Sequence, residues 1–456
     1  MMGKAVDITG EIEGRPLGAG QWRLLILCLL IVCFDGFDAQ IMGYTAPALL
    51  KDMHISRQVL GPVISAGLFG LMLGALGLGT LGDRIGRKRI ILLSAAILGT
   101  FSTLTAFAHS VPELAVLRFL TGIGLGGAMP GAIALVSEYM PKRRRGMMVT
   151  ITVCGFAIGP AVGGFVAGGL IHAYSWRAMF FVGGVIPLLL LPVLAALLPE
   201  SARFLIRRKA PSEAVAKSLD KVFLGARFPT NATYGHDEMR LPSTAIGEIF
   251  KDGRAGGTVL LWIAIFLNLI GINLQTSWLP LMITDLGFPV EQAVTATAMF
   301  HVGGSLGGLL LARLLDRFDL VRAVALISLV AGIAIIAIGF GGTTLTALRI
   351  TIFVAGVFVV GGQSALNALS GMYYPNHIRS TGSGWALGIG RLGAAVGPTV
   401  GSALAVMHLD MKTLFYVEAV PFFLVALAVF AIRFTGQTTA DRSDLVPQVA
   451  APAMSK

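Results

Sequence analysis

Long apolar runs separated by short polar segments dominate the chain. A helix that crosses a membrane needs about 20 mostly apolar residues, and twelve runs approach or exceed that length. They lie at 22–45, 60–81, 89–108, 112–137, 146–172, 177–198, 257–282, 291–315, 321–340, 343–370, 380–405 and 412–432. The pattern therefore predicts an all-α membrane protein with twelve transmembrane helices and both termini on one side of the membrane.

One long polar stretch divides the predicted helices into two sets of six. We predict an N-terminal six-helix half at 22–198, a linker loop at 199–256 and a C-terminal six-helix half at 257–432. Residues 1–21 and 433–456 are predicted to be terminal tails.

Short motifs recur in the same order in the two halves. The matched pairs are Asp83-Arg84 with Asp316-Arg317, Leu117-Arg118 with Leu348-Arg349, Tyr139 with Tyr374, and Gly159-Pro160 with Gly397-Pro398. Their separations stay between 231 and 238 residues. Two pseudo-symmetric six-helix halves, repeated in parallel, indicate the major facilitator fold.

The composition agrees with a membrane protein. Charged residues make up 13% of the chain and the mean hydropathy is +0.80, whereas soluble domains are about 25% charged. This excludes a soluble enzyme, a disordered chain and a nucleic-acid binder. The predicted tails, linker and alternate loops on one side hold 28 Lys and Arg residues, and the opposite loops hold 4. Because basic residues accumulate in cytoplasmic loops, both termini are predicted to be cytoplasmic.

Two carboxylates lie inside the first predicted helix. Asp35 and Asp38 are three residues apart, so they share a helix face. An ionised carboxylate within the bilayer is costly unless it is paired or faces water. We predict that both residues serve proton coupling or substrate gating. The alternative is a structural pair satisfied by a buried arginine.

A glycine-rich basic loop lies between the second and third predicted helices. It reads Gly79-Thr-Leu-Gly-Asp83-Arg84-Ile-Gly86-Arg87-Lys88. We predict that Asp83, Arg84, Gly86 and Arg87 form a gating latch that stabilises one access state. The alternative is a loop that only anchors the topology.

Arginines inside the apolar runs are candidates for binding an anion. Arg118 has two open roles: it binds a substrate carboxylate, or it pairs with Asp35 or Asp38. Arg391 has no carboxylate near it in its own helix, so we favour substrate contact for it. Glu418, near the outer end of the last helix, is predicted to be peripheral.

Polar and aromatic residues inside the predicted helices suggest a substrate lining. The candidates are Gln40, Asn268, Asn273, Gln275, Trp278, His301, Gln363, Asn367 and Tyr373. The alternative is ordinary hydrogen bonding between helices. The chain shows no metal-ligand spacing and no nucleotide-binding or nucleophile motif, so we predict no catalytic residue, no metal and no cofactor.

These motifs together resemble the aromatic acid:proton symporter family of the major facilitator superfamily. The resemblance is carried by Asp35-Gly-Phe-Asp38, by Gly79 to Lys88, by Arg118 to Pro130 and by Gly361 to Arg391. It implies import of benzoate, a hydroxybenzoate, protocatechuate or a related acid across a bacterial inner membrane. It also implies that Asp35, Asp38 and Asp83 matter for transport.

The expected function is therefore a proton-coupled symporter of an aromatic carboxylate that works by alternating access. Its expected partners are the aromatic acid, protons and the lipid bilayer, without nucleic acid, and the expected state is a monomer. The alternatives are a symporter of another organic acid or a sugar, and a drug:proton antiporter.

Overall fold

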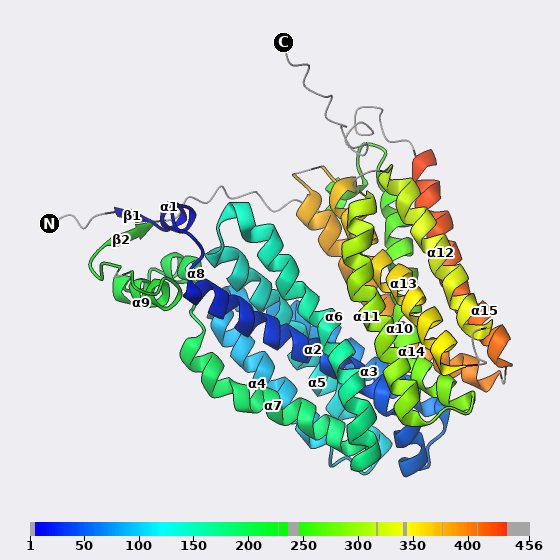
Figure 1. Ribbon diagram of the computed structural model, residues 1–456. Coiled ribbons are helices and arrows are strands. Elements are labelled where there is room, and N and C mark those ends of the chain that lie inside the picture. Colours follow the sequence, from blue (N-terminus) through cyan, green and yellow to red (C-terminus); the bar gives the residue numbers. More distant parts are fainter. Residues whose placement is uncertain are drawn as a thin grey trace. The chain divides into compact units, whose positions relative to one another are not determined.

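The computed structural model describes residues 5–226, 228–235, 246–315, 318–340, 344–375, 377–407 and 409–435. Within this part of the chain, twelve helices are long and apolar enough to cross a membrane (Figure 1), which confirms the predicted fold class. They are α2 (Ala19–Met53), α3 (Arg57–Ile85), α4 (Arg87–Thr105), α5 (Val111–Tyr139), α6 (Lys142–Ala173), α7 (Trp176–Leu197), α10 (Ala255–Asp285), α11 (Val290–Leu315), α12 (Leu320–Phe340), α13 (Leu345–Tyr373), α14 (Arg379–Val406) and α15 (Met411–Ala431). The Asp316-Arg317 motif and residues 436–456 of the predicted tail lie outside the described residues.

Short elements occupy the segments predicted as tail and linker. They are β1 (Ala5–Asp7), α1 (Ile8–Glu13), α8 (Ala202–Arg207), α9 (Ser212–Val222), β2 (Thr233–Gly235), η1 (Ile246–Phe250) and η2 (Ile432–Phe434). β1 pairs with β2 in parallel, and both strands lie with α1, α8 and α9 at one end of the first helices (Figure 1). α9 is amphipathic: Val215, Leu219 and Val222 share a buried stripe inside a charged sequence.

The chain forms two compact units. The first contains Met1–Arg240 and Ser277–Ala298, and the second contains Leu241–Thr276 and Met299–Lys456. The end of α10 and the start of α11 thus group with the first unit. These units are defined by contacts between residues. The predicted linker at 199–256 and the two six-helix halves on either side of it stay predictions.

Glycine seams hold corresponding helices together in the two units. In the first unit, Gly70 and Gly74 of α3 bring that helix close to the backbone of α5. In the second unit, Gly303 and Gly307 of α11 do the same against α13, 233 residues later. Small residues spaced by four let membrane helices approach closely. The repeat indicated by the motifs therefore extends to the packing of the helices.

Candidate functional site

A buried ion pair crosses the interior of the first unit. Arg118 Nη1 lies 3.0 Å from Asp38 Oδ2, and both side chains are almost fully buried. Asp38 Oδ1 accepts a hydrogen bond of 2.6 Å from Ser102. Arg118 Nη2 donates to the hydroxyls of Thr105 at 3.1 Å and Thr121 at 2.9 Å. Of the two roles open for Arg118, the structure shows the pairing with Asp38.

Local sequence explains how Arg118 reaches this position. A capping box of Ser110 and Glu113 starts α5, so Arg118 lies about two turns inside the helix. Its guanidinium also lies over the ring of Phe180, 4.7 Å from the centroid. A cavity of about 20 Å³ beside Arg118 and Asp38 has room for a single water molecule.

Asp35 has a different environment, although it lies only one turn before Asp38. It is 1% exposed, and neither carboxyl oxygen has a hydrogen-bond partner among the described residues. Asp35 borders a cavity of about 10 Å³ whose other lining residues are apolar, including Leu98 of α4 and Pro187 and Leu190 of α7. An unpaired buried charge is costly, so the neutral acid is the cheaper form here.

The predicted latch residues are held at the turn between α3 and α4. Arg87 Nη2 lies 2.7 Å from Asp83 Oδ1, its Nη1 donates to the carbonyl of Gly82 at 3.1 Å, and its Nε lies 3.6 Å from Glu138 Oε1. Gly86 separates the two helices with a φ of 109°, a conformation that favours glycine. Arg87 therefore connects residues of the loop to one another and connects the loop to α5 through Glu138.

Glu200 is a second anchor for this loop, and the sequence analysis missed it. Its Oε1 accepts hydrogen bonds from the backbone N–H groups of Lys88 at 3.1 Å and Ser201 at 2.9 Å. Arg207 of α8 donates to the carbonyl of Asp83 at 2.6 Å. The sequence feature that pointed to this role was an acidic residue two positions after the sixth apolar run, which ends at 198.

A chain of three amide side chains runs from the buried Asn268 through the half-buried Gln363 to the exposed Asn367 in the second unit. Asn268 of α10 donates to Gln363 of α13 at 2.7 Å, and Gln363 donates to Asn367 at 2.9 Å. The structure thus joins three of the predicted lining residues by hydrogen bonds. The chain of amides can offer both donors and acceptors to a hydroxylated ring.

Arg391 lies at the same level of the second unit without a counter-ion. Its neighbour Gly390 packs against Ile265 and Leu269, which places this part of α14 beside the turn of α10 that carries Asn268. Arg391 is half-buried, and no ion pair or hydrogen bond of its side chain is found within the described ranges. An uncompensated guanidinium in a membrane protein is a natural place for an anion.

Three other predicted lining residues are buried. Gln40 is in α2, Trp278 in α10 and His301 in α11. The Nε2 atom of His301 has no hydrogen-bond partner in the described part of the chain, and its ring packs edge-on against Phe300. Contact of these three residues with a substrate stays a prediction.

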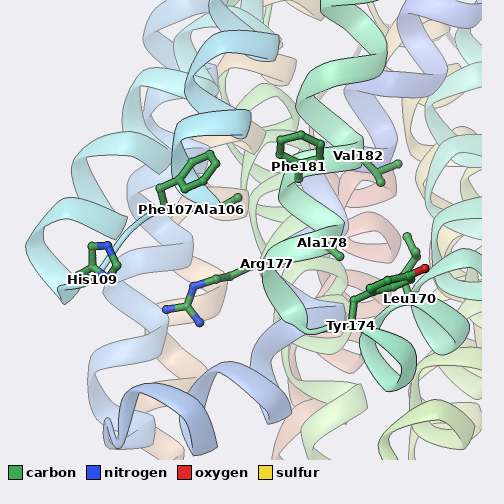
Figure 2. A pocket seen from close by; sticks show the side chains of 9 residues that line it. All are labelled: Ala106, Phe107, His109, Leu170, Tyr174, Arg177, Ala178, Phe181 and Val182. Atoms are coloured by element: carbon green, nitrogen blue, oxygen red, sulfur yellow. The ribbon is translucent and has the colours of Figure 1, made fainter.

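A hollow of about 620 Å³ at the ends of α4, α6 and α7 lies apart from this chemistry (Figure 2). It is lined by Ala106, Phe107, His109, Leu170, Tyr174, Arg177, Ala178, Phe181 and Val182. None of the predicted site residues lines it. Phe107 and Tyr174 are 60% and 79% exposed, so this hollow is a groove in the surface rather than an interior site.

Comparisons with known proteins identify the family of this chain. The family model described as Major Facilitator Superfamily matches residues 28–348 and 261–455. A gallate transporter of Pseudomonas putida is 41% identical over 93% of this chain and 95% of its own length. A 4-hydroxybenzoate transporter of the same organism is 39% identical over 94% and 96%, respectively.

A solved structure supports the fold. The crystal structure of a D-xylose-proton symporter covers 92% of this chain and 98% of its own, with a TM-score of 0.71 and 20% identity. At that identity the likeness concerns the fold alone. With the family model and the two close relatives, the chain belongs to the major facilitator superfamily and, within it, to the family of aromatic acid transporters.

Proposed function

We propose that this protein is a proton-coupled importer of an aromatic carboxylate, located in a bacterial inner membrane with both termini in the cytoplasm. The observation that carries the proposal is the buried pair of Asp38 and Arg118 beside the unpartnered carboxyl of Asp35. The names of the relatives, gallate and 4-hydroxybenzoate transporters, support the substrate class.

The second unit supplies the groups that suit such a substrate. Arg391 presents a planar fork that matches a carboxylate with two parallel hydrogen bonds. The amides of Asn268, Gln363 and Asn367 suit ring hydroxyl groups.

The first unit supplies the groups that suit proton coupling. Protonation of Asp38 would remove its charge and release Arg118, which is the only cation whose contact with Asp38 is seen within the described residues. Arg118 would then be available to the substrate carboxylate. Asp35 holds its proton in the present state and can give it up when its surroundings open to water.

The loop at Gly86 would act on the access states rather than on the substrate. Asp83 and Arg87, with Glu138 and Glu200, tie α3, α4 and α5 together at one end. A ligand or proton that favours one access state shifts the population between states. Breaking these ties would change the balance without changing the binding residues.

Uptake into proteoliposomes tests the proposal. Radiolabelled 4-hydroxybenzoate is offered with and without an inward proton gradient, with gallate, benzoate, protocatechuate and a sugar as competitors. We expect gradient-driven accumulation that aromatic acids block and the sugar does not. Competition by the sugar alone, or gradient-driven expulsion of dyes, would replace the proposal with one of the two alternative transport functions.

Matched aspartate variants of α2 test the coupling role. Asp35→Asn keeps the shape but removes the titratable carboxyl, and we expect it to lose accumulation. Asp52→Asn is the control, since Asp52 is in the same helix but is half-exposed, paired with Arg177. Full accumulation by Asp35→Asn would contradict the coupling role of this residue.

A further inference from the structure

A buried carboxyl in the second unit has no part in the function proposed above. Glu418 of α15 was predicted to be peripheral, but it is 1% exposed, and its Oε2 has no hydrogen-bond partner among the described residues. The prediction was wrong because α15 turns this face toward α10 and α12 rather than toward lipid. Ionisable residues inside a membrane are usually retained for function.

The contacts of α15 fix its register against α10. Gly256, near the start of α10, packs against Thr435, which follows α15. Fifteen residues later, Gly271 packs against the ring of Phe422, thirteen residues before Thr435. The two helices are therefore antiparallel and remain in contact over about four turns.

One turn beyond this contact, the register places Gln275 opposite Glu418. Gln275 follows Gly271 by four residues and Glu418 precedes Phe422 by four, so both lie about one turn along from the same contact. Gln275 is fully buried, and within the described ranges neither its Oε1 nor its Nε2 has a hydrogen-bond partner. Within the described residues, the amide of Gln275 and the Oε2 atom of Glu418 are thus both buried without a hydrogen bond, including one to each other.

The helices in contact with α15 at this level carry no nearby charge that would stabilise an ionised Glu418 among their described residues. α10 has a single charged residue, Asp285, at its last position, and α12 has only Arg322, near its first. On α15 itself, Lys412 lies more than one turn away, and Tyr416 points to the exposed side. At the level of Glu418, α12 presents only apolar side chains. An ionised Glu418 would have no counter-charge from these three helices.

A proton would make Glu418 and Gln275 complementary. A carboxylate offers only acceptors, so it can satisfy the amide N–H of Gln275 but not the amide oxygen. A carboxylic acid offers one donor and one acceptor, which match the oxygen and the nitrogen of the amide. Satisfying both sides of a buried polar pair avoids the penalty of leaving a group unpaired.

We propose that Glu418 is a second proton-binding site of this transporter, in the second unit one turn along from the contact of Gly271 with Phe422 and separate from Asp35 and Asp38. The proposal rests on proton-coupled transport as the function. In the described state the carboxyl holds a proton. It gives up that proton when α10 moves relative to α15 and admits water to the seam.

Infrared spectroscopy of the full-length purified protein tests the protonation. A neutral carboxyl has a C=O stretch that is separate from the carboxylate and amide bands. We expect Glu418→Gln to remove one component of this band at neutral pH. Glu113→Gln is the control, because Glu113 caps the exposed start of α5 and should not contribute. An unchanged band in Glu418→Gln would overturn the assignment.

Proton counting in proteoliposomes tests the role in transport. We expect Glu418→Gln to take up one proton fewer per substrate than the wild type. Glu418→Asp keeps a titratable group and should keep the wild-type ratio, which also controls for a folding defect of the first variant. Loss of the infrared component without a change in the ratio would show a structural acid and overturn the proposed role.

The two proposals fail in different ways. A wild-type protein that accumulates aromatic acid without proton uptake would overturn the proposed function and the transport role of Glu418 with it. A wild type that takes up protons, combined with an unchanged ratio in Glu418→Gln, would leave the function standing and remove only the second site.

Discussion

Removing either partner of the Asp38–Arg118 pair should destabilise the protein far more than removing both. The two side chains are at most 3% exposed and 3.0 Å apart. Leaving one member of a buried pair unpaired costs about 3–5 kcal/mol, whereas replacing both members by neutral groups is often close to neutral. Asp38→Asn should be the costlier single change, because arginine cannot lose its charge.

The loss of Arg118 should be milder, since Asp38 keeps its hydrogen bond from Ser102 and can take up a proton. We expect Arg118→Met at the low end of the range. The double variant should be more stable than Asp38→Asn alone, which corresponds to a coupling of about 3 kcal/mol.

The assay is reversible unfolding in mixed detergent micelles, applied to the wild type, both single variants and the double variant. The exposed pair of Arg57 and Asp285, with two contacts of 2.6 and 2.7 Å, is the control. Its coupling should not exceed about 1 kcal/mol. If the effects of Asp38→Asn and Arg118→Met simply add, within about 0.5 kcal/mol, the argument from burial is refuted.

Three further substitutions probe the other parts of the site. Gly86→Ala would place a side chain at a positive φ and against the carboxylate of Glu200. We therefore expect slower uptake and a stability loss of about 1–3 kcal/mol. Gly79→Ala is the control: a side chain there meets open space, so neither uptake nor stability should change. Arg391→Lys keeps the charge but loses the fork, so the KM for uptake should rise about tenfold, equivalent to about 1.4 kcal/mol; an unchanged KM would remove Arg391 from the substrate site. Asn268→Ala removes the hydrogen bond to Gln363 on α13 and should cost about 0.5–1.5 kcal/mol in the same unfolding assay. Asn273→Ala should cost less, because the amide of Asn273 donates to a carbonyl of its own helix.

Periodicity and length were sufficient to predict the twelve spans, because the bilayer sets a minimum length for each apolar run. The same reasoning could not find β1, β2 or α9. These elements lie in charged segments, where three-residue strands and a single amphipathic helix give weak local signals. Their stability depends on contacts between residues more than 200 positions apart, such as Ala5 with Thr233.

The sequence could place Asp35 and Asp38 in one helix but could not tell them apart. Their difference comes from neighbouring helices: α5 brings Arg118 to Asp38, while α4 and α7 surround Asp35 with apolar groups. Glu418 was misjudged for a related reason. Distance from the helix end was used as a measure of exposure, whereas the rotation of α15 about its axis decides which side chains face protein.

The parallel pairing of β1 with β2 also sets an order of events during biosynthesis. The first three described residues cannot find their partner strand until residue 235 has left the ribosome. At about 5–20 residues per second, this takes tens of seconds. Throughout that time β1 has no partner strand, while six helices enter the membrane. A bulky domain fused at this end would therefore interfere with the pairing of β1 and β2, even if every helix inserted correctly.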